Sequence, residues 1–242
     1  MEFVSPEGLR IDGRRPQELR ALQCKFGVLS CCDGSALFQA GNTKVFAAVY
    51  GPRVADIRGQ ALHDRALIKC EYAHAAFSTG AARRRRGRSR KSTELAALVR
   101  GALEQTILVE LLPRAQVEVC IQVLFADGGV TAACINAAML AVADAGIPVR
   151  DMVAACGAGH LEAMPLLDLN HTEAATGGLE VCVALHPALD RVVLLQADAK
   201  ASVDTLEAVT TLALQGCKAA AGAMREALLQ HVRSLAARRG AI

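Results

Sequence analysis

The pattern of hydrophobic and polar residues predicts a chain of strands and amphipathic helices. From Ser92 to about Leu112, apolar residues recur every three or four positions, which indicates a helix that Pro113 ends. A similar pattern predicts a helix over 204–238, with a break near Gly216 or Gly222. Shorter apolar runs predict strands at 24–30, 36–39, 44–50, 66–73, 117–124, 153–159, 179–185 and 191–198, with a loop over 53–64.

The stretch from Gln122 to Ile147 combines the end of a strand, a glycine turn and an alanine-rich helix. Small side chains allow such a helix to lie close to a sheet or another helix. The turn, Asp127-Gly128-Gly129, leads into the helix N-terminus, where free N–H groups and the helix dipole favour an anion. In phosphate chemistry we expect a basic residue after the glycines, but the neutral residues Val130 and Thr131 follow them.

Strands followed by helices occur twice along the chain, which predicts an α+β fold of two similar halves packed side by side, at about 1–148 and 149–242. The sequence shows no linker between them, so we expect one domain over 1–242. The composition is 52% hydrophobic but only 3% aromatic, with no Trp. The core is therefore expected to consist mainly of Ala, Val and Leu.

The charge distribution and the cysteine content bear on whether the protein binds RNA, holds a metal or is secreted. The net charge of +3 says little by itself, but much of the basic charge lies in Gly80–Lys91. This stretch predicts either an RNA-binding loop or a merely solvated one. Nine Cys without a CxxC pair or Cys/His zinc spacing predict reduced thiols in a cytosolic or nuclear protein and no metal site. No apolar run reaches the roughly 18 residues of a membrane span, and the N-terminus does not resemble a signal peptide.

Eight short strings, spread in order over most of the chain, resemble the RNase PH family. They are Leu9–Arg15, Asp33–Ser35, Gly41–Val45, Tyr50–Arg53, Phe77–Gly80, Ala126–Gly129, Asp144–Pro148 and Leu166–Asn170. The resemblance implies the RNase PH-like fold, which is similar to the second domain of ribosomal protein S5 and has two ββαβα-type halves. Within the family, the chain is most similar to ring subunits of the eukaryotic RNA exosome, and its opening residues are of a plant or algal type.

The resemblance also implies partners and a cellular location. These are RNA, other RNase PH-like subunits in a six-membered ring, RNA-binding cap subunits and exosome-associated nucleases, with no membrane. The implied setting is the nucleus, nucleolus and cytoplasm, where such complexes take part in rRNA processing and mRNA turnover.

Active family members attack RNA from its 3′ end with inorganic phosphate, and the residues implied for that chemistry are degenerate here. The phosphate-binding Gly-Gly-Thr-Arg string corresponds to Gly128, Gly129, Val130 and Thr131. Arg would give phosphate a charged, two-pronged donor that Thr lacks. Of two carboxylates six residues apart, the first corresponds to Asp168 and the second to Ala174. Glu173 lies one residue out of register and His171 is near.

The residues implied for gripping RNA are better preserved. Arg90 and Lys91 match the basic pair along the RNA path in the family, and Arg83, Arg84, Arg85, Arg86 and Arg88 precede them. Aromatic residues beside this stretch are few, namely Tyr72 and Phe77, so we expect little base stacking.

We therefore expect a catalytically inactive exosome subunit that binds and threads RNA and needs no cofactor. One alternative is an active phosphate-dependent 3′–5′ exoribonuclease, which would require Mg²⁺ and inorganic phosphate and release nucleoside diphosphates. The other is a free-standing basic RNA-binding protein.

Overall fold

The computed structural model describes residues 3–5, 8–55, 62–79, 89–161, 164–238 and 240. A first sheet has the strand order β1-β2-β3-β5-β4, and only the β4–β5 pair is parallel. Its strands are β1 (Leu22–Phe26), β2 (Gly34–Ala40), β3 (Thr43–Val54), β4 (Leu67–His74) and β5 (Ala115–Phe125). A second, antiparallel sheet has the order β7-β6-β8-β9. It contains β6 (Ala154–Leu161), β7 (Met164–Leu167), β8 (Leu179–His186) and β9 (Arg191–Ala197).

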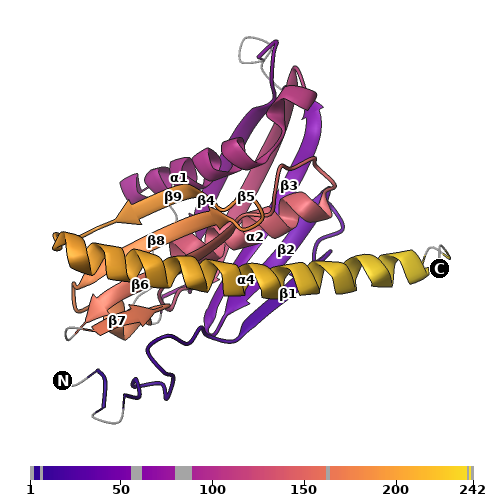
Figure 1. The fold of residues 1–242 in the computed structure, drawn as a ribbon. Coiled ribbons are helices and arrows are strands. Elements are labelled where there is room, and N and C mark those ends of the chain that lie inside the picture. Colours follow the sequence, from indigo (N-terminus) through magenta and orange to yellow (C-terminus); the bar gives the residue numbers. More distant parts are fainter. Residues whose placement is uncertain are drawn as a thin grey trace.

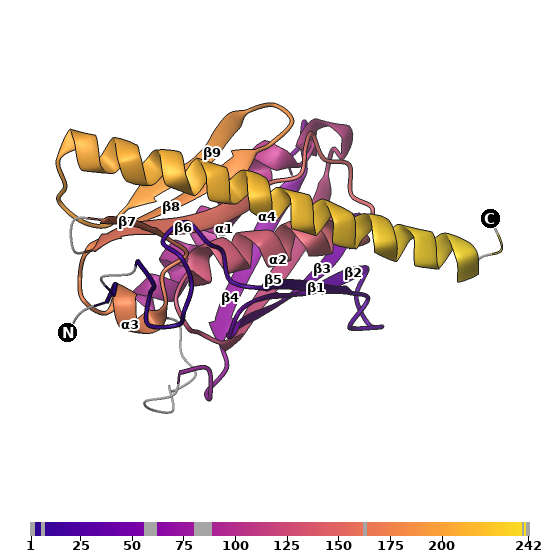
Figure 2. The same ribbon diagram turned by 60° about the horizontal axis from the view of Figure 1, so that its bottom comes forward.

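The helices connect and cover these sheets. They are α1 (Arg90–Thr106), a 3-10 turn (Val109–Leu111), α2 (Val130–Asp144), the short α3 (His171–Ala174) and α4 (Val203–Arg238). Helix α2 contacts β2 and β3 of the first sheet and β6 of the second, while α4 lies along β6 and β8 (Figures 1 and 2). None of the described helices, α4 included, combines the length and apolarity that crossing a membrane requires.

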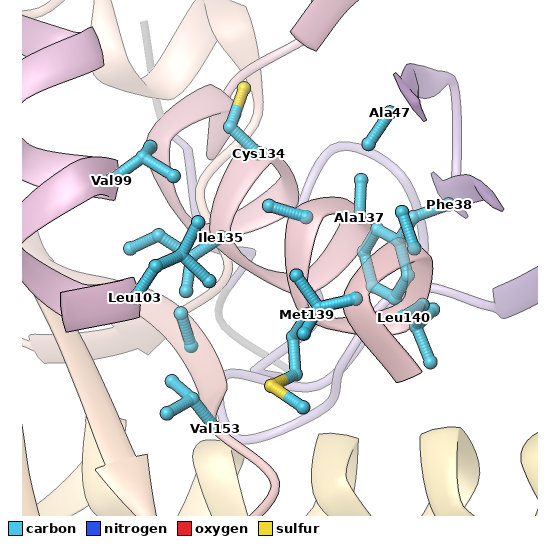
Figure 3. Packing of buried hydrophobic residues seen from close by; sticks show 14 of the residues in the cluster. Phe38, Ala47, Val99, Leu103, Cys134, Ile135, Ala137, Met139, Leu140 and Val153 are labelled. Carbon is cyan, nitrogen blue, oxygen red and sulfur yellow. The ribbon is translucent and has the colours of Figure 1, made fainter. Parts of the chain in front are cut away.

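Helix α2 is the centre of the hydrophobic core. Every residue from Ala132 to Val142 is buried, as expected for a helix that is apolar on all sides. Figure 3 shows Val99 and Leu103 of α1 on one side of it, and Phe38 of β2 on the other. The close approach predicted from the small side chains is present, because a Cβ on Gly34 would lie only 2.4 Å from the carbonyl oxygen of Ala141.

A buried polar contact joins α2 to the second sheet. The side-chain amide of Asn136 donates to the carbonyl oxygen of Ala155 at 2.9 Å, and its oxygen accepts from the N–H of Ala155 at 2.7 Å. Strand β7 pairs with β6 only over Ala158–Leu161, so this part of the β6 edge has no strand neighbour there. Asn136 takes the place of that neighbour and satisfies both backbone groups.

Several of the element boundaries predicted from sequence are wrong. Strand β1 ends at Phe26, whereas the strand was predicted to continue to residue 30. Strand β3 continues past Gly51-Pro52 to Val54, with a register shift that absorbs the proline. Helix α1 ends at Thr106, and the apolar pattern beyond it belongs to the 3-10 turn. Helix α4 is unbroken from Val203 to Arg238. Gly216 lets it approach the second sheet, where an added Cβ would lie 2.7 Å from the Leu167 side chain.

Candidate functional site

The predicted glycine turn lies where strand β5 passes into α2. Gly128 and Gly129 have φ values of 78° and 60°, which favour glycine, and Gly129 is the N-cap of α2. A Cβ on Gly128 would lie 2.2 Å from the carbonyl oxygen of Leu169. The turn is therefore in direct backbone contact with the loop that carries Asp168, so the two predicted parts of the site meet.

Arg20 fills the space between the turn and Asp168. Its Nε and Nη2 atoms donate to the two carboxylate oxygens of Asp168 at 2.8 and 2.6 Å. Nη1 donates to the carbonyl oxygen of Asp127 at 2.6 Å and to the hydroxyl of Thr43 at 3.2 Å. Nη2 also donates to the carbonyl oxygen of Gly128 at 3.2 Å. A guanidinium has five N–H donors, so this set uses all of them.

These contacts set the charge state of Arg20. Burial disfavours the charged guanidinium, but the hydrogen bonds and negative charge of Asp168 outweigh burial, and the pKa of Arg20 is raised. Asp168 is only 6% exposed and also accepts a hydrogen bond from the backbone N–H of Arg20. The Asp168 carboxylate is therefore neutralised by an internal partner.

Glu173, the out-of-register carboxylate, is committed elsewhere. It is fully buried and pairs through both oxygens with the guanidinium of Arg10. One of those oxygens also accepts from the backbone N–H of Asn170 at 2.8 Å, which caps α3. Ala174 follows on the same helix without a polar group, and His171 is exposed. The structure thus brings no second free carboxylate to Asp168 from this loop.

Arg14 and Asp12 brace the loop from outside. Arg14 donates to the carbonyl oxygen of Asp168 and to the side-chain oxygen of Asn170, both at 3.1 Å. Asn170 in turn donates to Asp12. Partial burial would raise the pKa of Asp12, but its hydrogen bonds from Asn170 and Arg14 lower it to about 2. The N-terminal segment therefore holds the loop through the hydrogen bonds of Arg14 and Asp12.

A catalytic magnesium–phosphate site does not fit these residues. Mg²⁺ needs carboxylate oxygens that are free to coordinate, whereas Asp168 and Glu173 are each bound by an arginine. The first turn of α2 carries Val130 and Thr131 in the half-buried positions where a cationic donor for phosphate was expected. Of that site, the turn and the helix N-terminus remain.

The residues predicted to grip RNA belong to a different segment from the glycine turn and Asp168, namely the start of α1. Arg90 and Lys91 are exposed in its first turn, which begins at Ser89 with a capping box and contains no acidic residue. Two cations at the positive end of a helix dipole are locally unfavourable. Arg83, Arg84, Arg85, Arg86 and Arg88 lie outside the described residues.

One group of possible metal ligands occurs among the described residues, and it lies on the first sheet. Side-chain atoms of Glu71, Glu118 and Cys120 lie within 4.8 Å of one another. Glu118 already pairs with Arg53, and burial and the two nearby carboxylates raise the pKa of Cys120 to about 11. The group therefore gives no support to a metal at Asp168.

Comparison with known proteins decides the family. Residues 18–148 match the RNase PH family, described as "3' exoribonuclease family, domain 1". The chain belongs to the RNase PH family. Its α+β arrangement is the RNase PH-like fold predicted from the sequence strings.

Named relatives agree with the predicted branch of the family. The Arabidopsis thaliana protein "Exosome complex component RRP41 homolog" is 52% identical and covers 100% of both chains. The human "Exosome complex component RRP41" is 47% identical over 96% of each chain. The chain is thus similar to RRP41 proteins, as the strings and the plant-type opening predicted.

Solved structures show the same fold. The crystal structure of rice (Oryza sativa) Rrp46 aligns with a TM-score of 0.81 at 25% identity, over 90% of this chain and 100% of that one. An Archaeoglobus fulgidus exosome structure, with RNA bound to the active site, aligns with a TM-score of 0.75 at 22% identity, over 88% and 91%.

Sequence reasoning missed Arg20 and the pairing of Arg10 with Glu173. Arg20 lies outside the eight strings, and its partner Asp168 is 148 residues away. A signal was nevertheless present, because buried carboxylates require partners and the arginines near the N-terminus were candidates for that role.

Proposed function

We propose that this chain is a non-catalytic ring subunit of an RNA exosome, which binds RNA and threads it toward nucleases elsewhere in the complex. Its similarity over the full chain to proteins named exosome complex component RRP41 supports the exosome assignment. The proposed partners are other RNase PH-like subunits in a six-membered ring, RNA-binding cap subunits, associated nucleases and RNA. The proposed roles are rRNA processing and RNA degradation in the nucleus, nucleolus and cytoplasm.

The lack of catalysis is supported chiefly by the Arg20–Asp168 pair. All five donors of Arg20 are occupied, so this cation has none left for an attacking phosphate. The carboxylate of Asp168 is likewise bound by Arg20, and the second carboxylate position, 174, carries Ala. Losing one charged donor from a site of this kind commonly costs about 10²–10³ in rate. We infer that the subunit works without a cofactor of its own.

RNA binding is supported by the first turn of α1. The charges of Arg90 and Lys91 add to the positive end of the helix dipole, which focuses positive potential outside the helix. Contacts of this kind bind the phosphates of any sequence, as a threading surface requires.

The retained glycine turn favours a second candidate, a phosphate-dependent 3′–5′ exoribonuclease. Gly128 and Gly129 still present a helix N-terminus to an anion. The assay that separates the candidates uses the reconstituted ring with its RNase PH-like partners, a labelled RNA, Mg²⁺ and phosphate. We expect no nucleoside diphosphates to be released, whereas phosphate-dependent release that requires this subunit would establish the second candidate.

A matched complex carrying Val130→Thr, Thr131→Arg and Ala174→Asp tests what has been lost. Return of phosphorolysis would identify these three positions as sufficient. Continued inactivity would show that the Arg20–Asp168 pair, or another position, also prevents the reaction.

A further inference from the structure

Two exposed phenylalanines from distant parts of the chain line one surface pocket. Phe77 is 66% exposed and Phe125 is 40% exposed. With Leu124 and three polar residues they surround a cavity of about 530 Å³. That volume falls within the range of roughly 300–1,000 Å³ that is usual for small-ligand sites. Large aromatic surfaces left in water at one place commonly mark a binding site.

The backbone places both residues at one end of the first sheet. Phe125 ends β5, where Lys44 is its partner residue on β3. The segment after β4 continues beside β5, since the N–H of Ala75 donates to the carbonyl oxygen of Val123 and that of Ala126 donates to the carbonyl oxygen of Ser78, both at 2.9 Å. Phe77 is therefore held next to the end of β5 by hydrogen bonds on either side of it.

The remaining lining residues are polar, and none of the described residues that line the pocket is acidic. They are Gln39, Asn42 and Lys44. The amide of Gln39 donates to the carbonyl oxygen of Gly41, and that of Asn42 donates to the carboxylate of Asp127, each at 2.9 Å. Both amides are thus oriented in advance, and Asn42 connects the pocket to the glycine turn of the candidate site.

We propose that this pocket is a subsite in which one nucleobase of a single-stranded RNA stacks on Phe77 and Phe125, with Lys44 at an adjacent phosphate. The proposal rests on the proposed RNA-binding function and adds a base-contacting position to it. Aromatic rings accept any base through its π-face, so such a subsite adds affinity without restricting sequence. It differs from the expectation of little stacking, which rested on Tyr72 and Phe77 alone, because Phe125 lines the same pocket as Phe77.

Charge favours RNA over a protein as the occupant. A cation and two amides next to aromatic rings match the phosphate, the base edges and the base face of a nucleotide. In the sequence, Phe77 also precedes the basic stretch that ends with Arg90 and Lys91. Contact with another protein is the outcome that the experiment must separate.

The test compares two ligands of equal charge on the purified full-length chain. One is a single-stranded oligoadenylate, and the other is a ribose-phosphate chain of the same length without bases. Binding is followed by fluorescence anisotropy. We expect Phe77→Ala with Phe125→Ala to weaken binding of the oligoadenylate about tenfold, as loss of base stacking implies, and to leave binding of the abasic chain unchanged. Phe77→Tyr with Phe125→Tyr should retain wild-type binding because Tyr keeps the aromatic ring.

Lys44→Ala should behave differently. It should weaken binding of both ligands and reduce the log–log salt slope by about one, whereas the phenylalanine variants should leave that slope unchanged. Leu111→Ala is the matched control, since Leu111 is 64% exposed and precedes β5, at the far end of that strand from Phe125. It should change neither affinity, and circular dichroism should show each variant folded.

The results also distinguish this subsite from the proposed function. If the phenylalanine variants bind both ligands like the wild type, the subsite is overturned. Equal weakening of both ligands would overturn it too, and so would a defect confined to assembly with ring partners, which would indicate a protein contact. If Arg90→Ala with Lys91→Ala leaves RNA binding unchanged while the phenylalanine variants weaken it, the grip at α1 is wrong and the subsite stands.

Discussion

Arg20 and Asp168 form a buried two-pronged ion pair, with N···O distances of 2.8 and 2.6 Å, across 148 residues of sequence. The pair joins the segment before β1 to the loop after β7. Through the carbonyl oxygens of Asp127 and Gly128, Arg20 also holds the turn before α2. One side chain therefore fixes three segments. The guanidinium and the carboxylate that form this contact are groups that phosphate chemistry would otherwise use.

Removing the cation should destabilise the fold strongly. Arg20→Met keeps much of the side-chain length but leaves the charge of Asp168 buried without its partner and frees two carbonyl oxygens. Breaking a buried pair from one side commonly costs 3–5 kcal/mol, so we expect a loss of about 3–5 kcal/mol in the free energy of unfolding, measured by urea denaturation.

Arg15→Met is the matched control for that measurement. Arg15 is an exposed arginine of the same N-terminal segment, so its replacement should change the free energy of unfolding by less than about 0.5 kcal/mol. Equal small effects of both variants would contradict the structural role given to Arg20.

Sequence reasoning located the elements better than their partners. The helix now called α2 was predicted from its alanines and the glycine turn, because both are local features of the chain. The end of α1 was misplaced because the residues after Thr106 keep an apolar spacing while the backbone leaves the helix at Ile107. An apolar pattern with a 3.6-residue period indicates that one side of a segment is buried. It does not by itself show at which residue the backbone stops being helical.

The pairing of charges could not be read in the same way. Nothing in the sequence distinguishes Arg10, Arg14 and Arg20. In the structure, however, Arg10 forms a salt bridge with Glu173 and Arg20 forms one with Asp168. Which arginine meets which carboxylate is decided by how β7 and its loop pack on the N-terminal segment, a contact between segments that are 148 to 163 residues apart in sequence. The same holds for Phe77 and Phe125, which become neighbours only once β4 and β5 pair.

Restoring a cation after the glycine turn should restore anion binding. Thr131→Arg adds a guanidinium in the first turn of α2, where the helix N-terminus remains. We expect inorganic phosphate to raise the melting temperature of this variant and not of the wild type. At a phosphate concentration of 100 times its Kd, the gain would be about 2.7 kcal/mol.

Thr131→Gln is the control, because it lengthens the side chain without adding charge. Phosphate should leave its melting temperature unchanged. Stabilisation of the wild type by phosphate to the same extent as Thr131→Arg would mean that another cation of the chain already serves the turn.

The first turn of α1 should show opposite effects on RNA binding and on stability. Arg90→Ala with Lys91→Ala removes phosphate contacts, so the log–log salt slope of RNA binding should fall by about one to two. The same change relieves repulsion with the helix dipole and should stabilise the fold by about 0.3–1 kcal/mol for each charge. Anisotropy over a salt series and urea denaturation measure the two effects.

Arg100→Ala separates this position from a general loss of charge. Arg100 lies on the same helix, away from its N-terminus, and pairs with Glu104 at 3.5 Å. It should leave the salt slope unchanged and should not increase stability. A slope reduced equally by Arg100→Ala would show that RNA responds to net charge and does not contact the helix start.

Removing the Asn136 amide should weaken the attachment of α2 to the second sheet. Asn136→Ala leaves both the N–H and the carbonyl oxygen of Ala155 without a partner at a buried edge of β6. Each unsatisfied buried group costs roughly 1–3 kcal/mol, so for two groups we expect urea denaturation to show a loss of about 2–6 kcal/mol. Gln230→Ala removes an exposed amide from α4 and should cost less than about 0.5 kcal/mol. Because α2 touches both sheets through Asn136 and its apolar faces, unfolding of the variant should remain a single transition. Two separated transitions would mean that the sheets unfold independently once this contact is lost.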